Sequence, residues 1–265
     1  MEIPLYQIDA FADRVFAGNP AAVCPLDAWL PDAVMQAIAA ENNLSETAFF
    51  VGGGGDYDLR WFTPAVEVDL CGHATLASAH VIFEHLEPGC RRVRFATRSG
   101  ILTVARDGDL LAMDFPANPP QPCAAPADLA GALGAEPREV LCTRDHYLVL
   151  LDDEDRVRAL APDPARIAAL DRWAVIATAP GRRSDFVSRF FAPRKGVPED
   201  PVTGSAHCVL APYWATRLGR TELAARQVSA RGGRLRCRLQ GDRVELAGRA
   251  VPFMQGKIRI GEAGR

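Results

Sequence analysis

The fold of this chain is decided by residues 66–83, which read Val66-Glu67-Val68-Asp69-Leu70-Cys71-Gly72-His73-Ala74-Thr75-Leu76-Ala77-Ser78-Ala79-His80-Val81-Ile82-Phe83. Apolar and acidic residues alternate over 66–70, as they do at the end of a β-strand. Gly72 then permits a tight turn, and small or apolar residues cover most of the helix that follows. A helix that is apolar nearly all round is buried inside a protein.

The start of this helix is predicted to bind an anion. Burial leaves the first N–H groups of a helix without partners unless another group accepts from them. Those donors and the positive end of the helix dipole attract a carboxylate or another oxyanion. His73 would stand at the mouth of such a site.

A second stretch, residues 200–215, has the same order of glycine, polar residue, alanine and small-apolar helix: D-P-V-T-G-S-A-H-C-V-L-A-P-Y-W-A. Setting Gly72-His73-Ala74 against Gly204-Ser205-Ala206 aligns the two stretches. We infer two related halves, each wrapped round one buried helix, with both helix starts facing a shared cleft. Two core helices of unrelated origin are the alternative interpretation of so short a repeat.

Composition places the chain among globular proteins and argues against several partners. A length of 265 residues suits one large domain or two modest ones. The formal net charge of -3 gives no basis for nucleic-acid binding, and no segment is apolar enough to span a membrane, so a cytoplasmic protein is expected. The seven cysteines contain no C-x-x-C pair, which indicates neither a disulfide framework nor a zinc site.

The order of predicted elements favours an α+β fold. Predicted strands outnumber helices, and few strand–helix–strand units recur. Residues 116–126 contain five prolines and are the best candidate for a linker. Glu46 begins a predicted strand, where a carboxylate is either a solvated edge residue or a functional acid, and its position alone favours the solvated interpretation.

Several motifs, taken together, resemble the PhzF family of phenazine-biosynthesis-like proteins, within the diaminopimelate epimerase fold superfamily. They come in family order and span nearly the whole chain. The matching segments are residues 9–11 with 16–23, 43–49, 71–75, 185–193 and 199–207.

The resemblance implies two pseudo-symmetric lobes, each a curved, mostly antiparallel sheet wrapped around a central buried helix, with the active site between them. The lobes are expected at 1–117 and 126–255, and the last strand, near 256–262, can return to the first lobe. The resemblance also implies a cofactor-independent isomerase, acting as a homodimer on a small carboxylate by general acid/base catalysis, with no metal.

Site residues follow from the resemblance by motif. Glu46, His73 and Asp200 match the family's catalytic positions, and the resemblance now favours a functional role for Glu46. The substrate-binding positions are Ser45, Gly72, Gly204 and Ser205.

Two alternatives stay open. One is a racemase or epimerase of an amino or hydroxy acid that uses a thiol pair; it is disfavoured because Cys71 aligns with Thr203, so the second thiol is missing. The other is a non-catalytic protein that binds small carboxylates.

Overall fold

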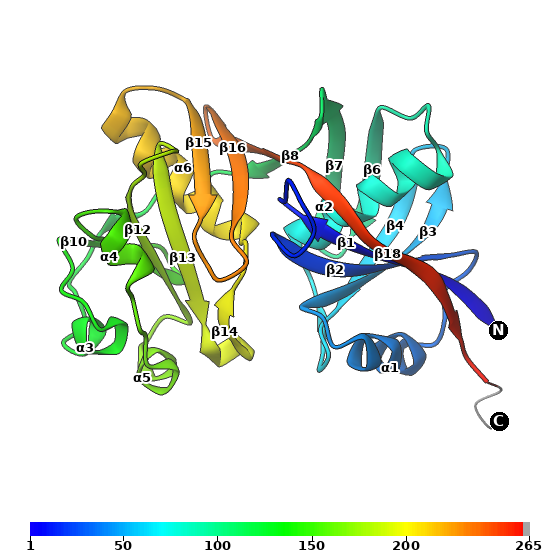
Figure 1. Cartoon of the computed structure of the whole chain (residues 1–265), viewed down its shortest axis with the longest axis horizontal. Coiled ribbons are helices and arrows are strands. Elements are labelled where there is room, and N and C mark those ends of the chain that lie inside the picture. Colours follow the sequence, from blue (N-terminus) through cyan, green and yellow to red (C-terminus); the bar gives the residue numbers. More distant parts are fainter. Residues whose placement is uncertain (262–265) are drawn as a thin grey trace. The chain divides into compact units, whose positions relative to one another are not determined.

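Strands make up most of the secondary structure in the computed structural model, which describes residues 1–261 (Figure 1). The chain divides into two units. The first comprises Met1–Asp114 together with the chain from Ala247 onward, and the second comprises Phe115–Leu246.

The first unit contains a sheet, a peripheral helix and a central helix. Its strands pair in the order β18–β1–β2–β3–β4, and β4 continues through β6 to β7 and β8. Neighbours are antiparallel except for β2 with β3 and β4 with β6. The strands are β1 (Glu2–Ala10), β2 (Asn19–Leu26), β3 (Glu46–Gly53), β4 (Asp56–Phe62), β5 (Glu67–Val68), β6 (Arg92–Thr97), β7 (Gly100–Asp107), β8 (Leu110–Pro116) and β18 (Ala250–Arg259). The helices are α1 (Asp32–Asn42) and α2 (Gly72–Val81), which continues into a π-helical turn, η1 (Ile82–Leu86).

The second unit repeats this plan. Its strands pair in the order β9–β10–β11–β12–β13, and β13 contacts both β14 and β15. The parallel pairs are β11 with β12 and β13 with β15. The strands are β9 (Gln121–Pro122), β10 (Glu139–Cys142), β11 (His146–Leu150), β12 (Ala174–Pro180), β13 (Phe186–Ala192), β14 (Val197–Asp200), β15 (Glu222–Gln227), β16 (Gly233–Gln240) and β17 (Arg243–Gly248). The helices are α3 (Leu129–Leu133), α4 (Glu154–Arg158), α5 (Pro164–Ala169), the 3-10 turn η2 (Pro193–Lys195) and α6 (Gly204–Leu218).

One succession of elements occurs in both units. In the first, β4 pairs with the short antiparallel β5, the chain enters α2, and it returns as β6 parallel to β4. In the second, β13 pairs with the antiparallel β14, the chain enters α6, and it returns as β15 parallel to β13. The two glycine-headed helices therefore occupy the same topological place. The predicted α+β fold with two similar halves is confirmed.

The proline-rich segment 116–126 is tied to the second unit. Its β9 pairs with the end of β10, and the N–H of Ala117 donates to the carbonyl of Asp242. The predicted lobes of 1–117 and 126–255 treated this segment as a connection, because proline density marks turns and linkers. Prolines also tolerate a short edge strand, which is the form the segment takes.

The chain after Ala247 belongs to the first unit. Strand β18 runs antiparallel to β1, with Ile3 opposite Ile258 and Ala10 opposite Ala250. This strand starts earlier than the predicted one near 256–262. Residue 262, the last of that predicted strand, lies outside the described residues.

Helix α2 is enclosed by its own unit, as its apolar circumference predicts. Leu76, Ala77 and Ala79 are fully buried, and so are Ile82 and Phe83 in the following turn. The alanines let neighbouring backbone approach closely, because each adds only a methyl group to the helix surface. Among the described helices, none combines the length and the apolar character that crossing a membrane requires.

Candidate active site

Glu46 is the first residue of β3, and the sheet fixes its position. In the parallel pairing of β2 with β3, Glu46 lies beside Ala21, and the next residue, Thr47, lies opposite Phe62 of β4. The Glu46 side chain keeps 18% of its surface exposed. It is therefore neither a solvated edge residue nor a fully enclosed one.

His73, the second residue of α2, lies directly against this carboxylate. Its Nε2 is 3.2 Å from Oε2 of Glu46, and only 7% of the His73 side chain is exposed. Burial lowers the pKa of His73 to about 3, although a hydrogen bond to the backbone carbonyl of Pro20 opposes the shift. At neutral pH the imidazole is therefore uncharged, and the contact is not one between two opposite charges.

Cys71 completes a row of three functional groups. It is the N-cap residue of α2 and is buried, and its Sγ lies 3.5 Å from Nδ1 of His73. The imidazole thus has the thiol at one nitrogen and the Glu46 carboxylate at the other. The sequence motif contains Cys71 and His73, but it does not predict that their side chains meet.

The start of α2 presents its donors without a side-chain cap. The hydroxyl and the N–H of Thr75 both bond to the carbonyl of Cys71, at 2.6 and 3.1 Å, and hold the first turn in place. Gly72 is half-buried there, and so is Ser45 beside Glu46. An uncapped first turn with a half-buried glycine suits the binding of a small anion.

The loop between β1 and β2 positions the backbone that contacts His73. The buried carboxylate of Asp9 accepts a hydrogen bond from the N–H of Phe16 at 2.9 Å. Gly18 has φ +68°, and a Cβ there would collide with the carbonyl oxygen of Ala10. The loop thereby delivers Pro20, whose carbonyl contacts His73. These residues belong to the motif at 9–23, which by itself indicates no role for them.

In the second unit, Asp200 is held by a compact network. Its carboxylate accepts a 2.5 Å hydrogen bond from the hydroxyl of Thr203. The buried side chain of Gln227 accepts from the N–H of Thr203 at 2.9 Å and donates to the carbonyl of Asp200 at 2.6 Å. Gln227 comes from β15 and was missed, because no sequence signal links it to residues 200–203.

Helix α6 begins directly after this network. Gly204 is half-buried and Ser205 is exposed, and α6, like α2, has no side-chain cap. His207 donates from Nδ1 to the carbonyl of Thr203 at 2.7 Å, and burial lowers its pKa to about 4. His207 is therefore a neutral histidine of the core at neutral pH.

The predicted residues fall into two groups, one in each unit. Glu46, His73, Gly72 and Ser45 belong to the first unit, where the Glu46–His73 contact joins two of them. The second group is Asp200, Gly204 and Ser205, which are in the second unit. Glu199, the residue before Asp200, forms a two-pronged ion pair with Arg189, at 2.7 and 2.8 Å.

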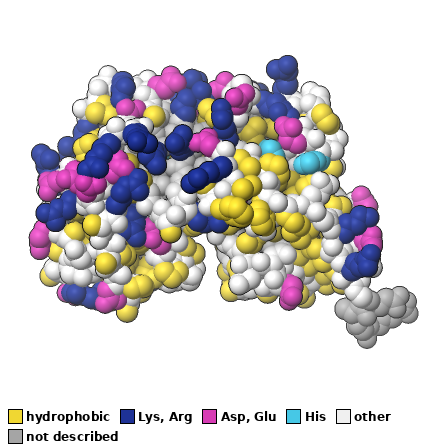
Figure 2. Space-filling model, in the orientation of Figure 1, with side chains coloured by type: hydrophobic (Ala, Val, Ile, Leu, Met, Phe, Trp, Pro, Cys, Tyr) yellow, Lys and Arg dark blue, Asp and Glu magenta, His cyan; other side chains and the backbone are white. Residues whose placement is uncertain are grey.

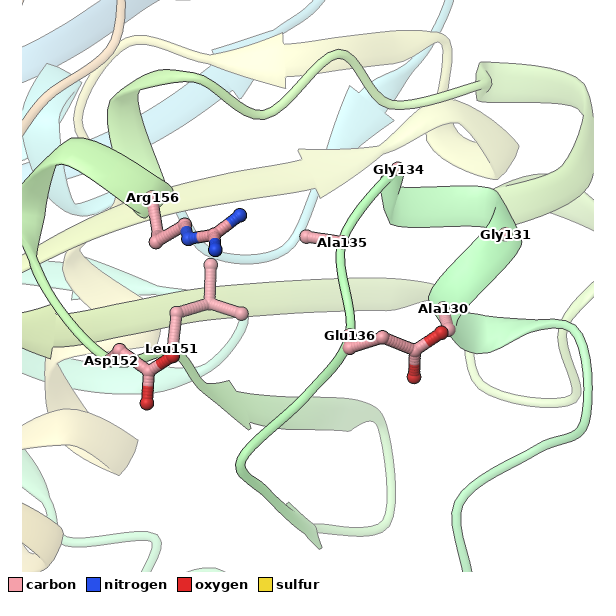
Figure 3. Close-up of a pocket in the computed structure, with 8 residues that line it drawn as sticks. All are labelled: Ala130, Gly131, Gly134, Ala135, Glu136, Leu151, Asp152 and Arg156. Atoms are coloured by element: carbon pink, nitrogen blue, oxygen red, sulfur yellow. The ribbon is translucent and has the colours of Figure 1, made fainter.

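A separate hollow of about 510 Å³ occurs in the second unit (Figure 3). It lies between α3, the turn after it and the start of α4. Glu136, Asp152 and Arg156 supply its charged side chains. None of the predicted site residues lines it, and its mixed charges point to no particular chemistry.

Comparison with known proteins places the chain in a family. The family described as PhzC-PhzF, phenazine biosynthesis-like protein, matches residues 8–256. An uncharacterized isomerase of Pseudomonas aeruginosa is 60% identical over 260 residues, covering 98% of this chain and all of that protein. The chain therefore belongs to the PhzC-PhzF family, and its expected enzyme class, an isomerase, is confirmed by the names of such relatives.

Solved structures agree with this assignment. The crystal structure of a phenazine biosynthesis protein of the PhzF family from Enterococcus faecalis has a TM-score of 0.96 and 47% identity, covering 98% of this chain and all of that one. A predicted epimerase from Pseudomonas aeruginosa has a TM-score of 0.75 at 22% identity, with 98% of this chain and all of that chain covered. This second likeness shows that the fold is shared with an epimerase-like protein.

The buried imidazole predicts a pH dependence of stability. The pKa of His73 is about 3 in the folded protein and about 6.5 when unfolded. Between these values the unfolded chain binds the extra proton, so the free energy of unfolding decreases as pH falls from about 6.5 toward 3. Replacing His73→Gln should remove up to about 1.4 kcal/mol per pH unit from this slope. Urea unfolding at several pH values measures the slope of the free energy of unfolding against pH.

The control is His85→Gln, because His85 is exposed in the same unit. Its slope should match that of the unaltered protein. Equal slopes for His73→Gln and the unaltered protein would contradict the assignment of a neutral His73.

Proposed function

We propose that this protein is a cofactor-independent isomerase that moves a proton on a small carboxylate substrate, with Glu46 as the general acid and base. The contact that carries the proposal is the 3.2 Å approach of His73 Nε2 to Glu46 Oε2, at the uncapped start of a buried helix. Membership of an isomerase-containing family supports the reaction class.

Glu46 suits both proton transfers of such a reaction. Moving a double bond or inverting a centre requires removing a proton from carbon and returning one, and a single positioned carboxylate can do both. The imidazole of His73 lies 3.2 Å from the carboxylate and, being neutral, places no positive charge beside it. We assign Glu46 as the base, and His73 orients it or relays the second proton.

The negative charge that develops on the substrate needs hydrogen-bond donors in fixed positions. We assign this role to the first turn of α2, whose N–H groups at Gly72 and His73 have no side-chain cap. These donors and the helix dipole stabilise a substrate carboxylate more strongly as charge accumulates on it. Ser45, half-buried next to Glu46, is proposed to contact the substrate.

The second unit is proposed to act in the same reaction. Asp200, Gly204 and Ser205 match the family motif, and α6 occupies the topological place in its unit that α2 has in the first. The Gln227 network holds Asp200 and the residue before α6 in one arrangement. This pre-organisation supports a binding role for the Gly204 and Ser205 N–H groups and for the Ser205 hydroxyl.

Two alternative functions make different demands on the site. A thiol-pair epimerase needs a cysteine at the start of each central helix; Cys71 is the N-cap of α2, but Thr203 is the N-cap of α6. This observation favours the single carboxylate. A non-catalytic binder of carboxylates would bind ligand saturably, but solvent deuterium would not enter the ligand.

Glu46→Gln is predicted to lower turnover by at least about 100-fold while ligand binding persists, because the amide keeps the shape and loses the base. The measurement is deuterium uptake by a panel of cyclic and amino carboxylates in heavy water, followed by NMR. Glu41→Gln is the matched control, since Glu41 is exposed at the end of α1. Unchanged turnover in Glu46→Gln would rule out this assignment.

Ser205→Ala is predicted to lower kcat/KM by about tenfold or more, the effect of losing one hydrogen bond to a charged group. Because Ser205 is exposed, the fold should be unaffected. The same deuterium assay measures the effect, with Ser99→Ala, an exposed serine in a strand turn, as the control. Identical effects of the two substitutions on kcat/KM would contradict the proposed role of Ser205 in substrate binding.

The homodimer expected from the sequence is also a proposal, and an apolar patch supports it. Phe16 and Phe253 are 70% and 46% exposed and form an edge-to-face pair at 5.6 Å, next to the 38% exposed Met254. Figure 2 shows hydrophobic side chains gathered on the face of the first unit that β18 crosses. Such patches commonly mark interaction surfaces. The cytoplasmic location stays a prediction from the sequence.

Phe253→Asp is predicted to convert the dimer to a monomer, because it buries a charge in an apolar contact. Light scattering on a sizing column measures the mass of both proteins. Arg259→Asp, at the far end of β18, is the control. A monomeric unaltered protein, or a dimeric Phe253→Asp variant, would disprove this role for the patch.

A further inference from the structure

Three side chains at the candidate site have the chemistry of a metal-ligand set. One ligand atom each from Glu46, Cys71 and His73 lies within 4.8 Å of the other two. The set offers one oxygen, one sulfur and one nitrogen. Magnesium and calcium prefer oxygen ligands throughout, whereas zinc accepts all three donor types.

We propose that Glu46, Cys71 and His73 together bind one Zn²⁺ ion, with a fourth coordination position left for water or a small ligand. Three protein ligands and one open position are typical of zinc sites that are accessible to small molecules. Cys71 and His73 are buried, and the partly exposed Glu46 provides the side from which an ion can enter.

The distances are close to those that a tetrahedral ion requires. Two ligands of such an ion lie about 3.5 Å apart. Here Cys71 Sγ is 3.5 Å from one nitrogen of His73, and Glu46 Oε2 is 3.2 Å from the other. Because one ion binds only one of the two nitrogens, the side chains must turn so that the widest separation between ligand atoms, at most 4.8 Å, closes to about 3.5 Å.

The surroundings would hold the ligands in place. The Pro20 carbonyl contacts a ring nitrogen of His73, and a zinc-bound histidine usually makes such a bond from its second nitrogen. Thr75 bonds twice to the carbonyl of Cys71, which fixes the backbone of the thiol ligand. Glu46 is fixed by its place in the β2–β3 register.

Zinc binding has two chemical consequences. The thiol of Cys71 becomes a thiolate, and its proton passes to the buffer, so one proton is released for each ion bound. The ion also occupies the carboxylate of Glu46, which then cannot accept a proton from carbon. Zinc therefore acts as an inhibitor. This inhibition rests on the proposed isomerase function, whereas the binding itself does not.

The sequence spacing gave no sign of this site. Zinc motifs are recognised from closely spaced cysteine and histidine pairs. Here Cys71 and His73 are separated by one residue, and Glu46 comes from a different strand. The expectation of no zinc site followed from the missing C-x-x-C pair, which a set assembled across β3 and α2 does not need.

The test is a titration of the chelator-treated full chain with Zn²⁺ in competition with a chromophoric chelator. One equivalent should bind, and Co²⁺ in its place should show a thiolate-to-cobalt charge-transfer band. Cys71→Ser should lower the affinity by at least about 100-fold, the upper end of the loss caused by removing an outer partner of a zinc ligand. It should also abolish the charge-transfer band.

Cys142→Ser is the control, because Cys142 is a half-buried thiol in the second unit, in contact with Cys123. It should bind zinc as the unaltered protein does. Binding and the band retained in Cys71→Ser, or lost in Cys142→Ser, would overturn the proposal. So would the absence of binding by the unaltered protein.

Glu46→Gln is the second variant, and it keeps the test decisive if Cys71→Ser does not fold. It should weaken zinc binding and keep the charge-transfer band, since the thiolate remains. Unchanged zinc affinity in Glu46→Gln would remove Glu46 from the ligand set and overturn the three-ligand proposal. The binding measurements need no substrate, so their failure is distinct from a failure of the deuterium assay.

Discussion

The contact between Glu46 and His73 depends on two structural constraints, the register of one strand pair and the burial of one helix. The parallel register of β3 on β2 places Glu46 beside Ala21, and the burial of α2 places His73 against it. A slip of one residue in β3 would turn the carboxylate to the opposite face of the sheet. The burial that brings the imidazole there also keeps it neutral, because the loss of hydration of a charged ring outweighs the hydrogen bond to the Pro20 carbonyl.

The two units share a topology but differ in the side chains at equivalent positions. Strand β3 begins with Glu46 beside Ala21 of β2, whereas β12 begins with Ala174 beside His146 of β11. Only the first unit therefore has a carboxylate at this point of the repeated plan. The proposed function uses this difference: Glu46 of the first unit is proposed as the base, and Gly204 and Ser205 of the second unit are proposed to bind the substrate. This asymmetry fits a reaction in which one group handles both proton transfers.

Much of the fold was readable because it depends on local patterns. Alternating residues marked the strands, and the apolar circumference of 72–83 marked the buried helix. The motifs also identified Glu46 and His73 as candidates. The contact between Gln227 and Thr203 was not readable, because it joins residues distant in sequence. Cys71 and His73 are only two residues apart, but the motif does not show that their side chains meet. The proline-rich segment 116–126 was ambiguous, since proline suits both linkers and short edge strands.

The glycine at position 18 makes the site sensitive to a residue that touches no substrate. A side chain there would strike the Ala10 carbonyl and force the loop to move, and the displacement would pass to Pro20 and so to the ring of His73. Natural variants at this position would lose activity while every chemically active side chain stayed intact. In a genetic survey, such alleles would resemble active-site lesions, although their defect would be one of backbone geometry.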